Sequence, residues 1–268
     1  MMSQSTLHDW RTPVSPRSLA LWLLSASAPA PFTASGLIER AAIFGIEDSA
    51  VRVALGRLVR EGMAVQPERG VYALGPAASA LHAKARGWMR VEETVRPWAG
   101  GWLVVLTHPL GRTDRAGLQR RERALRLSGF AAAGAGTWVR ADNLAQDIAT
   151  LRRALAGLGL EGEAPLLAGC MAEPAQDAAW RALWPARALE TGYDYWLSEM
   201  AASSDRVARM ATTDAARETY LLGQSVLRAI NSDPLLPAEL VDVARRQEMV
   251  AAMQRYNAMA LEHWGRIG

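Results

Sequence analysis

The chain of 268 residues contains a single cysteine, Cys170, so no disulfide can form within it. Lysine is equally scarce: Lys84 is the only one, and arginine supplies all other basic residues. The four histidines do not share the spacing of metal ligands, and no hydrolase motif accompanies them. No stretch approaches the roughly 20 apolar residues of a membrane span. These absences favour a cytoplasmic protein that is not an enzyme and that has no catalytic residues, bound metal or cofactor.

Half of the residues are hydrophobic and 21% are charged, which is typical of a folded chain. At this length we expect more than one domain. The net charge of +3 is too small to indicate nucleic-acid binding by itself. Residues 173–268 hold 10 basic and 13 acidic groups, whereas residues 1–98 hold 11 and 8. The C-terminal third is therefore the part least suited to face phosphates.

The first 80 residues predict a winged helix-turn-helix domain. Residues 17–28 begin after two prolines and resemble either a first helix or a secretory signal; we favour the helix. Thr33–Ser35 supplies an N-cap for a helix over 36–42, and Asp48 or Ser49 is expected to cap the next one, which ends near 62. Short strands are predicted at 63–65 and 70–74. Helix, helix, turn, helix and hairpin is the winged-helix order.

The rest of the chain predicts an α+β, multidomain protein. Residues 81–98 are expected to form a linker helix. Residues 99–172 show the order βαββαβ, which predicts a ferredoxin-like central domain. Residues 173–268 predict an all-α C-terminal domain, interrupted by a sharp break at 233–237 and ending in a helix over 238–264.

The predicted helix after the turn has two distinct sides. At about 100° per residue, Val51, Leu55, Leu58 and Val59 face inward and Arg52 lies at the border. A helix that enters the major groove of DNA needs small groups beside a few long donors. We therefore expect DNA to be contacted by the outer side, the border and the turn between the strands, namely Ser49, Arg52, Val53, Gly56, Arg57, Arg60 and Arg69. An ordinary solvated arginine face is the competing interpretation.

Phe44–Met63 resembles the PaaX family of transcriptional repressors, in which a Phe-Gly-Ile turn precedes a Val-Arg-x-Ala helix ending in Arg-Leu-Val-x-Glu-Gly. The resemblance continues through Trp98–Trp102, Ser128–Phe130, Gly136–Arg140 and Asp233–Leu240. The turn Glu68–Gly70 is shorter and less basic than is usual for the family. The resemblance implies a homodimeric repressor of an aromatic-acid catabolic operon. It would bind double-stranded operator DNA and be released by a small-molecule effector, an aromatic acyl-CoA thioester.

A flat hydrophobic effector needs aromatic walls. We expect its pocket at the junction of the central and helical domains, formed by Trp102, Trp138, Arg123, Trp184 and Trp196. For any single tryptophan, core packing is the competing interpretation. The neighbouring arginines 120, 121, 123 and 126 could bind a CoA phosphate, add to DNA contact or form a solvated face.

Two alternatives to a repressor belong to other functional classes. The ferredoxin-like middle resembles small CRISPR-associated nucleases. Under this alternative, Asp114 of this chain would take part in a metal site like theirs. One carboxylate makes a poor magnesium site, so a structural or dimerising role is favoured. The other alternative is an interaction module that keeps a winged-helix shape without binding DNA.

Overall fold

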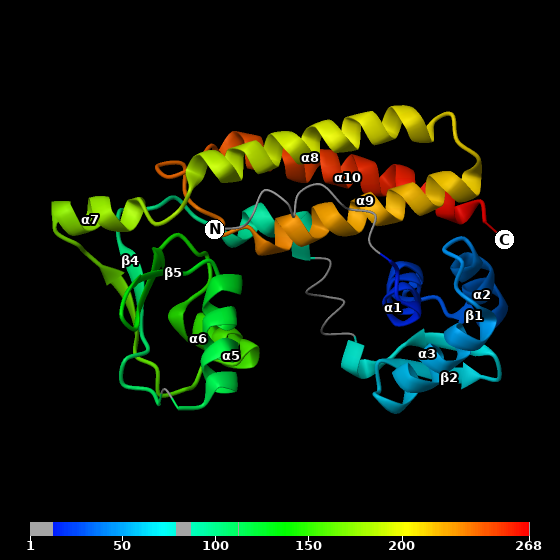
Figure 1. Ribbon diagram of the computed structural model, residues 1–268, viewed down its shortest axis with the longest axis horizontal. Helices are drawn as coiled ribbons and strands as arrows, with labels where there is room; N and C mark the ends of the chain where they lie inside the picture. Colours follow the sequence, from blue (N-terminus) through cyan, green and yellow to red (C-terminus); the bar gives the residue numbers. More distant parts are fainter. Residues whose placement is uncertain (1–12, 79–86, 112, 268) are drawn as a thin grey trace. The chain divides into compact units, whose positions relative to one another are not determined.

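The computed structural model describes residues 13–78, 87–111 and 113–267 and has an α+β architecture with two small antiparallel sheets (Figure 1). Contacts divide the chain into two compact units. The first contains Met1–Met89, Leu197–Leu227 and Ala251–Gly268, and the second contains Arg90–Trp196 and Arg228–Val250. Helices α8 (Ala186–Val207), α9 (Thr212–Ser232) and α10 (Val243–Gly265) contribute residues to both units. The domain boundaries expected at 80, 98 and 172 remain a prediction.

The N-terminal part of the first unit consists of three helices and a three-stranded sheet. Its elements are α1 (Pro16–Ser27), β1 (Phe32–Thr33), α2 (Ala34–Ala42), α3 (Asp48–Arg60), β2 (Ala64–Glu68) and β3 (Val71–Leu74). The strand order is β1-β3-β2, and both pairings are antiparallel. The signal-like segment is thus helix α1, whose Pro16 lies in the first turn, where its missing N–H has no intrahelical acceptor.

The caps of α2 and α3 were predicted with different success. The side chain of Thr33 accepts a hydrogen bond from the Gly36 amide, which confirms the expected cap of α2. The prediction for α3 was wrong, because its N-cap is Glu47 and no side chain caps it. The Asp48 carboxylate is instead paired with Arg52, one turn along the helix, at 2.6 Å. The Asp48 side chain is thus engaged in an ion pair and does not cap the helix.

Aromatic side chains join these elements to the part of the first unit contributed by α9 and α10. Trp22 of α1 lies edge-on to Tyr220 at a centroid distance of 4.9 Å and to Trp264 at 5.1 Å. Phe44, in the turn before α3, contacts Tyr220 at 5.2 Å. In the same unit the Tyr256 hydroxyl forms a buried hydrogen bond with the Ser203 hydroxyl, which donates a hydrogen bond to the Glu218 carboxylate. The first unit therefore has one core that contains residues of α1 together with Trp264 and Ile267.

The second unit contains a four-stranded antiparallel sheet. Its elements are β4 (Trp102–Leu106), α5 (Arg115–Leu127), β5 (Ala131–Gly134), β6 (Thr137–Ala141), α6 (Ile148–Leu158) and β7 (Leu166–Cys170). The strand order is β5-β6-β4-β7. Helices α5 and α6 lie side by side (Figure 1). Their residues Ala124, Leu125, Leu151 and Leu155 pack with Val105 and Trp138 in one core. The other core contains Trp102, Val104 and Val139 together with Trp180 and Trp184, from α7 (Pro174–Arg181) and just beyond it.

Two expected helices differ from the observed ones. The linker helix expected over 81–98 lies partly outside the described residues. Of its described part, Gly87–Thr94 is a 3₁₀ helix kinked at Arg90, and residues 95–98 are not helical. The last helix was expected to begin at 238 but begins at Val243. Asp242 accepts a hydrogen bond from the Arg245 amide at 3.1 Å, so this side chain sets the start of α10. No helix in the described part of the chain is long and apolar enough to cross a membrane.

We predict that Tyr256 makes the protein sensitive to alkaline pH. Burial raises the pKa of Tyr256 to about 12, whereas an unfolded chain would ionise it near 10. The folded state therefore keeps this proton to a higher pH than the unfolded state. The contribution of Tyr256 to the free energy of unfolding is complete below pH 10 and is lost as the pH rises towards 12. In urea unfolding, the wild type should lose about 1.4 kcal/mol more stability between pH 9 and pH 11 than Tyr256→Phe does. Parallel pH profiles would contradict this.

Candidate nucleic-acid interface

Helix α3 presents a polar side with small residues to the exterior of the first unit. Val51, Leu55 and Leu58 are 1% exposed or less and pack on α1 and α2, and Val59 is partly buried, as the periodicity predicts. The opposite side and Arg52 are exposed, and Val53 retains 55% of its accessible surface. The residues predicted to contact DNA from α3 are Ser49, Arg52, Val53, Gly56, Arg57 and Arg60, and all are accessible.

Ion pairs separate the arginines of this surface into two kinds. Arg52 is paired with Asp48, and this hydrogen bond raises the pKa of its guanidinium. Arg17 of α1 neutralises Glu61 at the other end of α3, at 2.6 Å. Neither Arg57 nor Arg60 has an ion pair with a described residue, and Arg60 donates a hydrogen bond to the Gly56 carbonyl at 3.2 Å. The unneutralised positive charge of α3 therefore belongs to Arg57 and Arg60.

Gly56 lies in the middle of this exposed side, and packing does not require it. A Cβ placed there would meet no atom within 4 Å. At Gly36 of α2, by contrast, a Cβ would lie 2.9 Å from the ring of Phe32, so packing explains that glycine. A glycine in a helix interior destabilises the helix by about 1 kcal/mol relative to alanine. Packing among the described residues therefore does not require a glycine at position 56.

The turn between β2 and β3 places Arg69 at the tip of a short hairpin. Gly70 follows it with φ +79°, which few other residues adopt without strain. Pro67 lies on β2, an edge strand of the sheet, where the absence of an N–H is tolerated. Arg69 is exposed and forms no ion pair with a described residue. Like Arg57, it can bind an anion from outside the protein.

The five residues expected to bind the effector are not gathered in one place. Trp102 and Trp184 stack at 6.0 Å, and the Trp102 indole donates to Asp177 at 2.9 Å. Trp138 belongs to the core on the α5 and α6 side of the same sheet, and Arg123 is exposed on α5. Trp196 lies on α8 beside Tyr195. Trp102 is completely buried, so its environment is that of a core residue.

Sequence reasoning missed a buried polar cluster in the second unit. Arg246 is 2% exposed and binds Glu92 through two hydrogen bonds of 2.9 and 3.1 Å. Its third nitrogen donates to the Leu236 carbonyl at 2.8 Å. Tyr193 donates to Asp233 at 2.6 Å, and burial raises the pKa of both groups, although Tyr193 and Arg246 oppose the effect at Asp233.

The neighbouring arginine of this cluster, Arg140, has no carboxylate of the described residues as a hydrogen-bond partner. It donates to the carbonyls of Ser128 and Pro234 and to the side chain of Asn143. Burial lowers the pKa of Arg140 to about 10. Asn143 also donates to the Leu235 carbonyl at 2.8 Å, so both side chains hold the segment 233–237 against the sheet. The only signal in the sequence was an arginine at the end of an otherwise apolar strand.

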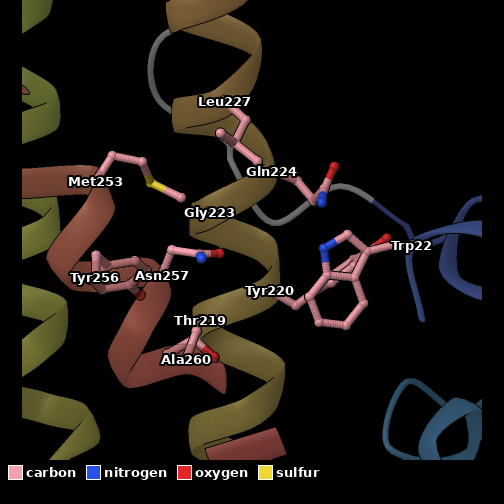
Figure 2. Close-up of a pocket in the computed structure, with 10 residues that line it drawn as sticks. All are labelled: Trp22, Thr219, Tyr220, Gly223, Gln224, Leu227, Met253, Tyr256, Asn257 and Ala260. Atoms are coloured by element: carbon pink, nitrogen blue, oxygen red, sulfur yellow. The ribbon is translucent and has the colours of Figure 1, made fainter. Parts of the chain in front are cut away.

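A second feature missed by the sequence is a small pocket in the first unit (Figure 2). Trp22 of α1, the α9 residues Tyr220 and Gln224, and the α10 residues Tyr256 and Asn257 contribute to its lining. The complete lining contains no charged side chain. Aromatic rings and amide groups suit an uncharged group, but nothing in the sequence pattern connected these three helices.

The candidate metal residue Asp114 has a structural role. It is the N-cap of α5, where its carboxylate accepts from the Ala116 amide at 2.9 Å, and it lies 3.6 Å from Arg120. In the described ranges, no group of three or more His, Cys, Asp or Glu side chains could hold a metal ion. Burial raises the pKa of the Cys170 thiol, so less of the reactive thiolate forms.

Comparison with known proteins finds a solved structure of similar fold but no match that indicates a function. No protein-family model matches the chain, and no curated protein matches it. It is similar to a solved structure, the uncharacterized protein Rv0674 from Mycobacterium tuberculosis, with a TM-score of 0.68 and 25% sequence identity. The match covers 94% of this chain and 97% of that one. The α+β fold is thus found over nearly the full length of another protein.

We predict that Gly56→Ala separates folding from binding. The added methyl group meets open space, so the variant should be more stable by about 0.5–1 kcal/mol. Gly157→Ala on α6, also exposed and with nothing within 4 Å, is the matched control. Thermal unfolding should show both variants at or above the wild-type Tm. If α3 contacts DNA, as the sequence predicts, only Gly56→Ala should weaken binding to duplex DNA, and equal affinities for the two variants would show that Gly56 is not at such an interface.

Proposed function

We propose that this protein is a DNA-binding transcriptional regulator that reads double-stranded operator DNA with helix α3. The observation that carries the proposal is the exposed side of α3. There Arg57 and Arg60 have no acidic partner among the described residues and lie close to Gly56, while the other side of the helix is buried. Arginine can bind guanine through two hydrogen bonds in the major groove, and a small neighbour lets the helix approach the bases.

The order of elements around α3 supports this proposal. Two helices precede it, an antiparallel hairpin follows it, and β1 completes the sheet in the order β1-β3-β2. We interpret this as a winged helix-turn-helix with Arg69 at the tip of the wing, where it would contact the minor groove or a phosphate. An interaction module of the same shape would not need unneutralised arginines on α3.

The second unit is interpreted as carrying a ferredoxin-like domain. Its elements follow the order βαββαβ, and its sheet has the order β5-β6-β4-β7. We assign it a structural or dimerising role in a cytoplasmic, homodimeric repressor. This assignment, and release from DNA by an aromatic acyl-CoA, rest on the PaaX resemblance. Ligand binding would act by favouring a dimer whose spacing no longer fits two half-sites.

Replacing Arg57 by alanine tests the role of α3 directly. Arg57→Ala should weaken binding to the duplex upstream of the protein's own gene by about 1–3 kcal/mol, or roughly 5- to 150-fold. The Tm should not change, because the side chain has no partner among the described residues. Arg217→Ala, at an arginine of α9 that is also exposed, removes the same charge and is the control. If the two variants bind with equal affinity in a gel shift, α3 is not the DNA-reading element.

The effector proposal has its own test. Titrating the bound duplex with acyl-CoA thioesters should release the DNA when the acyl group is aromatic. Free coenzyme A and a short straight-chain thioester should leave it bound. Release by none of the thioesters, with DNA binding otherwise intact, would contradict an acyl-CoA effector while leaving the regulator proposal in place.

A further inference from the structure

Helix α5 of the second unit has a row of arginines on its outer side. Arg115, Gln119, Arg123 and Arg126 follow one another at intervals of four, four and three residues. At about 100° per residue they fall within about 80° of one another. Ala124 and Leu125 on the opposite side are completely buried. Burial of that side therefore holds the row in the solvent.

Carboxylates neutralise the arginines of α5 outside this row more completely than those within it. Arg121, on the inner side, is bound by Glu161 at 2.6 Å, and Arg120 lies 3.6 Å from Asp114. Arg115 and Arg123 have no ion pair with a described residue. Arg126 has only a long contact of 3.8 Å with Glu122. The face formed by Arg115, Arg123 and Arg126, called here the α5 arginine face, thus keeps a net positive charge.

An aromatic ring orients one of these guanidinium groups. The Arg126 guanidinium carbon lies 5.1 Å from the centre of the Trp138 ring, which is itself buried in the core below α5. Stacking on an aromatic face restricts the guanidinium without neutralising it. Arg126 is therefore held at the surface with its charge available to an anion.

The spacing of the row fits a polyanion. Arg115 and Arg126 are about 16 Å apart along the helix at 1.5 Å per residue. That length corresponds to about five base-pair steps along the axis of duplex DNA, so the row can meet more than one phosphate. A single small phosphate could not reach both ends of the row. A helix can contact phosphates without entering a groove of the DNA, because such contacts do not involve the bases.

We propose that the α5 arginine face binds the phosphate backbone of duplex DNA, in addition to the contacts of α3. The proposal takes its ligand, duplex DNA, from the proposed function, but it concerns a different unit and a sequence-independent contact. It assigns Arg123, expected from the sequence at the effector pocket, to DNA instead. Under this assignment the second unit adds affinity, and α3 supplies the preference for one sequence.

Salt dependence tests the proposal, because each phosphate contact contributes a slope of about −0.9 to log K against log salt concentration. The variant is the full-length triple substitution Arg115→Gln, Arg123→Gln and Arg126→Gln, measured on a duplex of random sequence. The matched control is Arg187→Gln, Arg217→Gln and Arg255→Gln. It changes the net charge equally at exposed arginines of α8, α9 and α10. Far-ultraviolet circular dichroism and Tm confirm that both proteins fold.

The α5 variant should flatten the slope by about 2.7, so between 50 and 200 mM salt the wild type should lose about 40-fold more affinity than this variant. The control should keep the wild-type slope. Equal slopes for the two triple variants would overturn the proposal. So would loss of coenzyme A binding by the α5 variant with an unchanged DNA slope, because the face would then serve a small phosphate ligand.

Failure here can be told apart from failure of the proposed function. The α3 variant Arg57→Ala is compared on the upstream and random duplexes. If its sequence preference is lost while the α5 slope is unchanged, the regulator proposal stands and the α5 proposal falls. If the α5 slope changes while Arg57→Ala keeps full preference, α5 binds DNA and α3 does not read it. A wild type that binds neither duplex overturns both.

Discussion

The burial of one side of α3 determines the surface that the first unit presents. Val51, Leu55 and Leu58 are 1% exposed or less, and burying each such side chain contributes about 1.5–3 kcal/mol. This contribution fixes the rotation of the helix about its axis. Arg57 and Arg60 must then point away from the core. The candidate interface is thus a direct consequence of the packing behind it.

The aromatic cluster of Trp22, Phe44, Tyr220 and Trp264 extends that constraint to the C-terminal helices. Phe44 lies in the turn that precedes α3, and Tyr220 contacts both Phe44 and Trp22. The small pocket of Figure 2 shares Trp22 and Tyr220 with this cluster. If the ring of Trp22 or Tyr220 moved, direct contacts within the first unit would transmit the movement to Phe44 in the turn before α3.

Local patterns predicted much of the fold and little of its long-range chemistry. The inward residues of α3 and the Thr33 cap follow from spacing along a few turns. The α3 cap was wrong because Asp48 had a competing partner in Arg52, and propensity does not rank a cap against an ion pair. The grouping of Trp102, Trp138 and Trp196 assumed that neighbouring tryptophans share a pocket. Strand geometry instead places Trp102 and Trp138 in cores on opposite faces of one sheet.

The sequence by itself determined the periodic features: which side of α3 and of α5 is apolar, where arginines recur on the opposite side, and where prolines and glycines interrupt the chain. Only the tertiary structure decided which charges are neutralised by partners far away in the sequence. Arg17 meets Glu61 from 44 residues away, and Arg246 meets Glu92 from 154 away. Periodicity depends on neighbours within a turn or two, whereas the partner of a charge depends on which distant segments the core brings together.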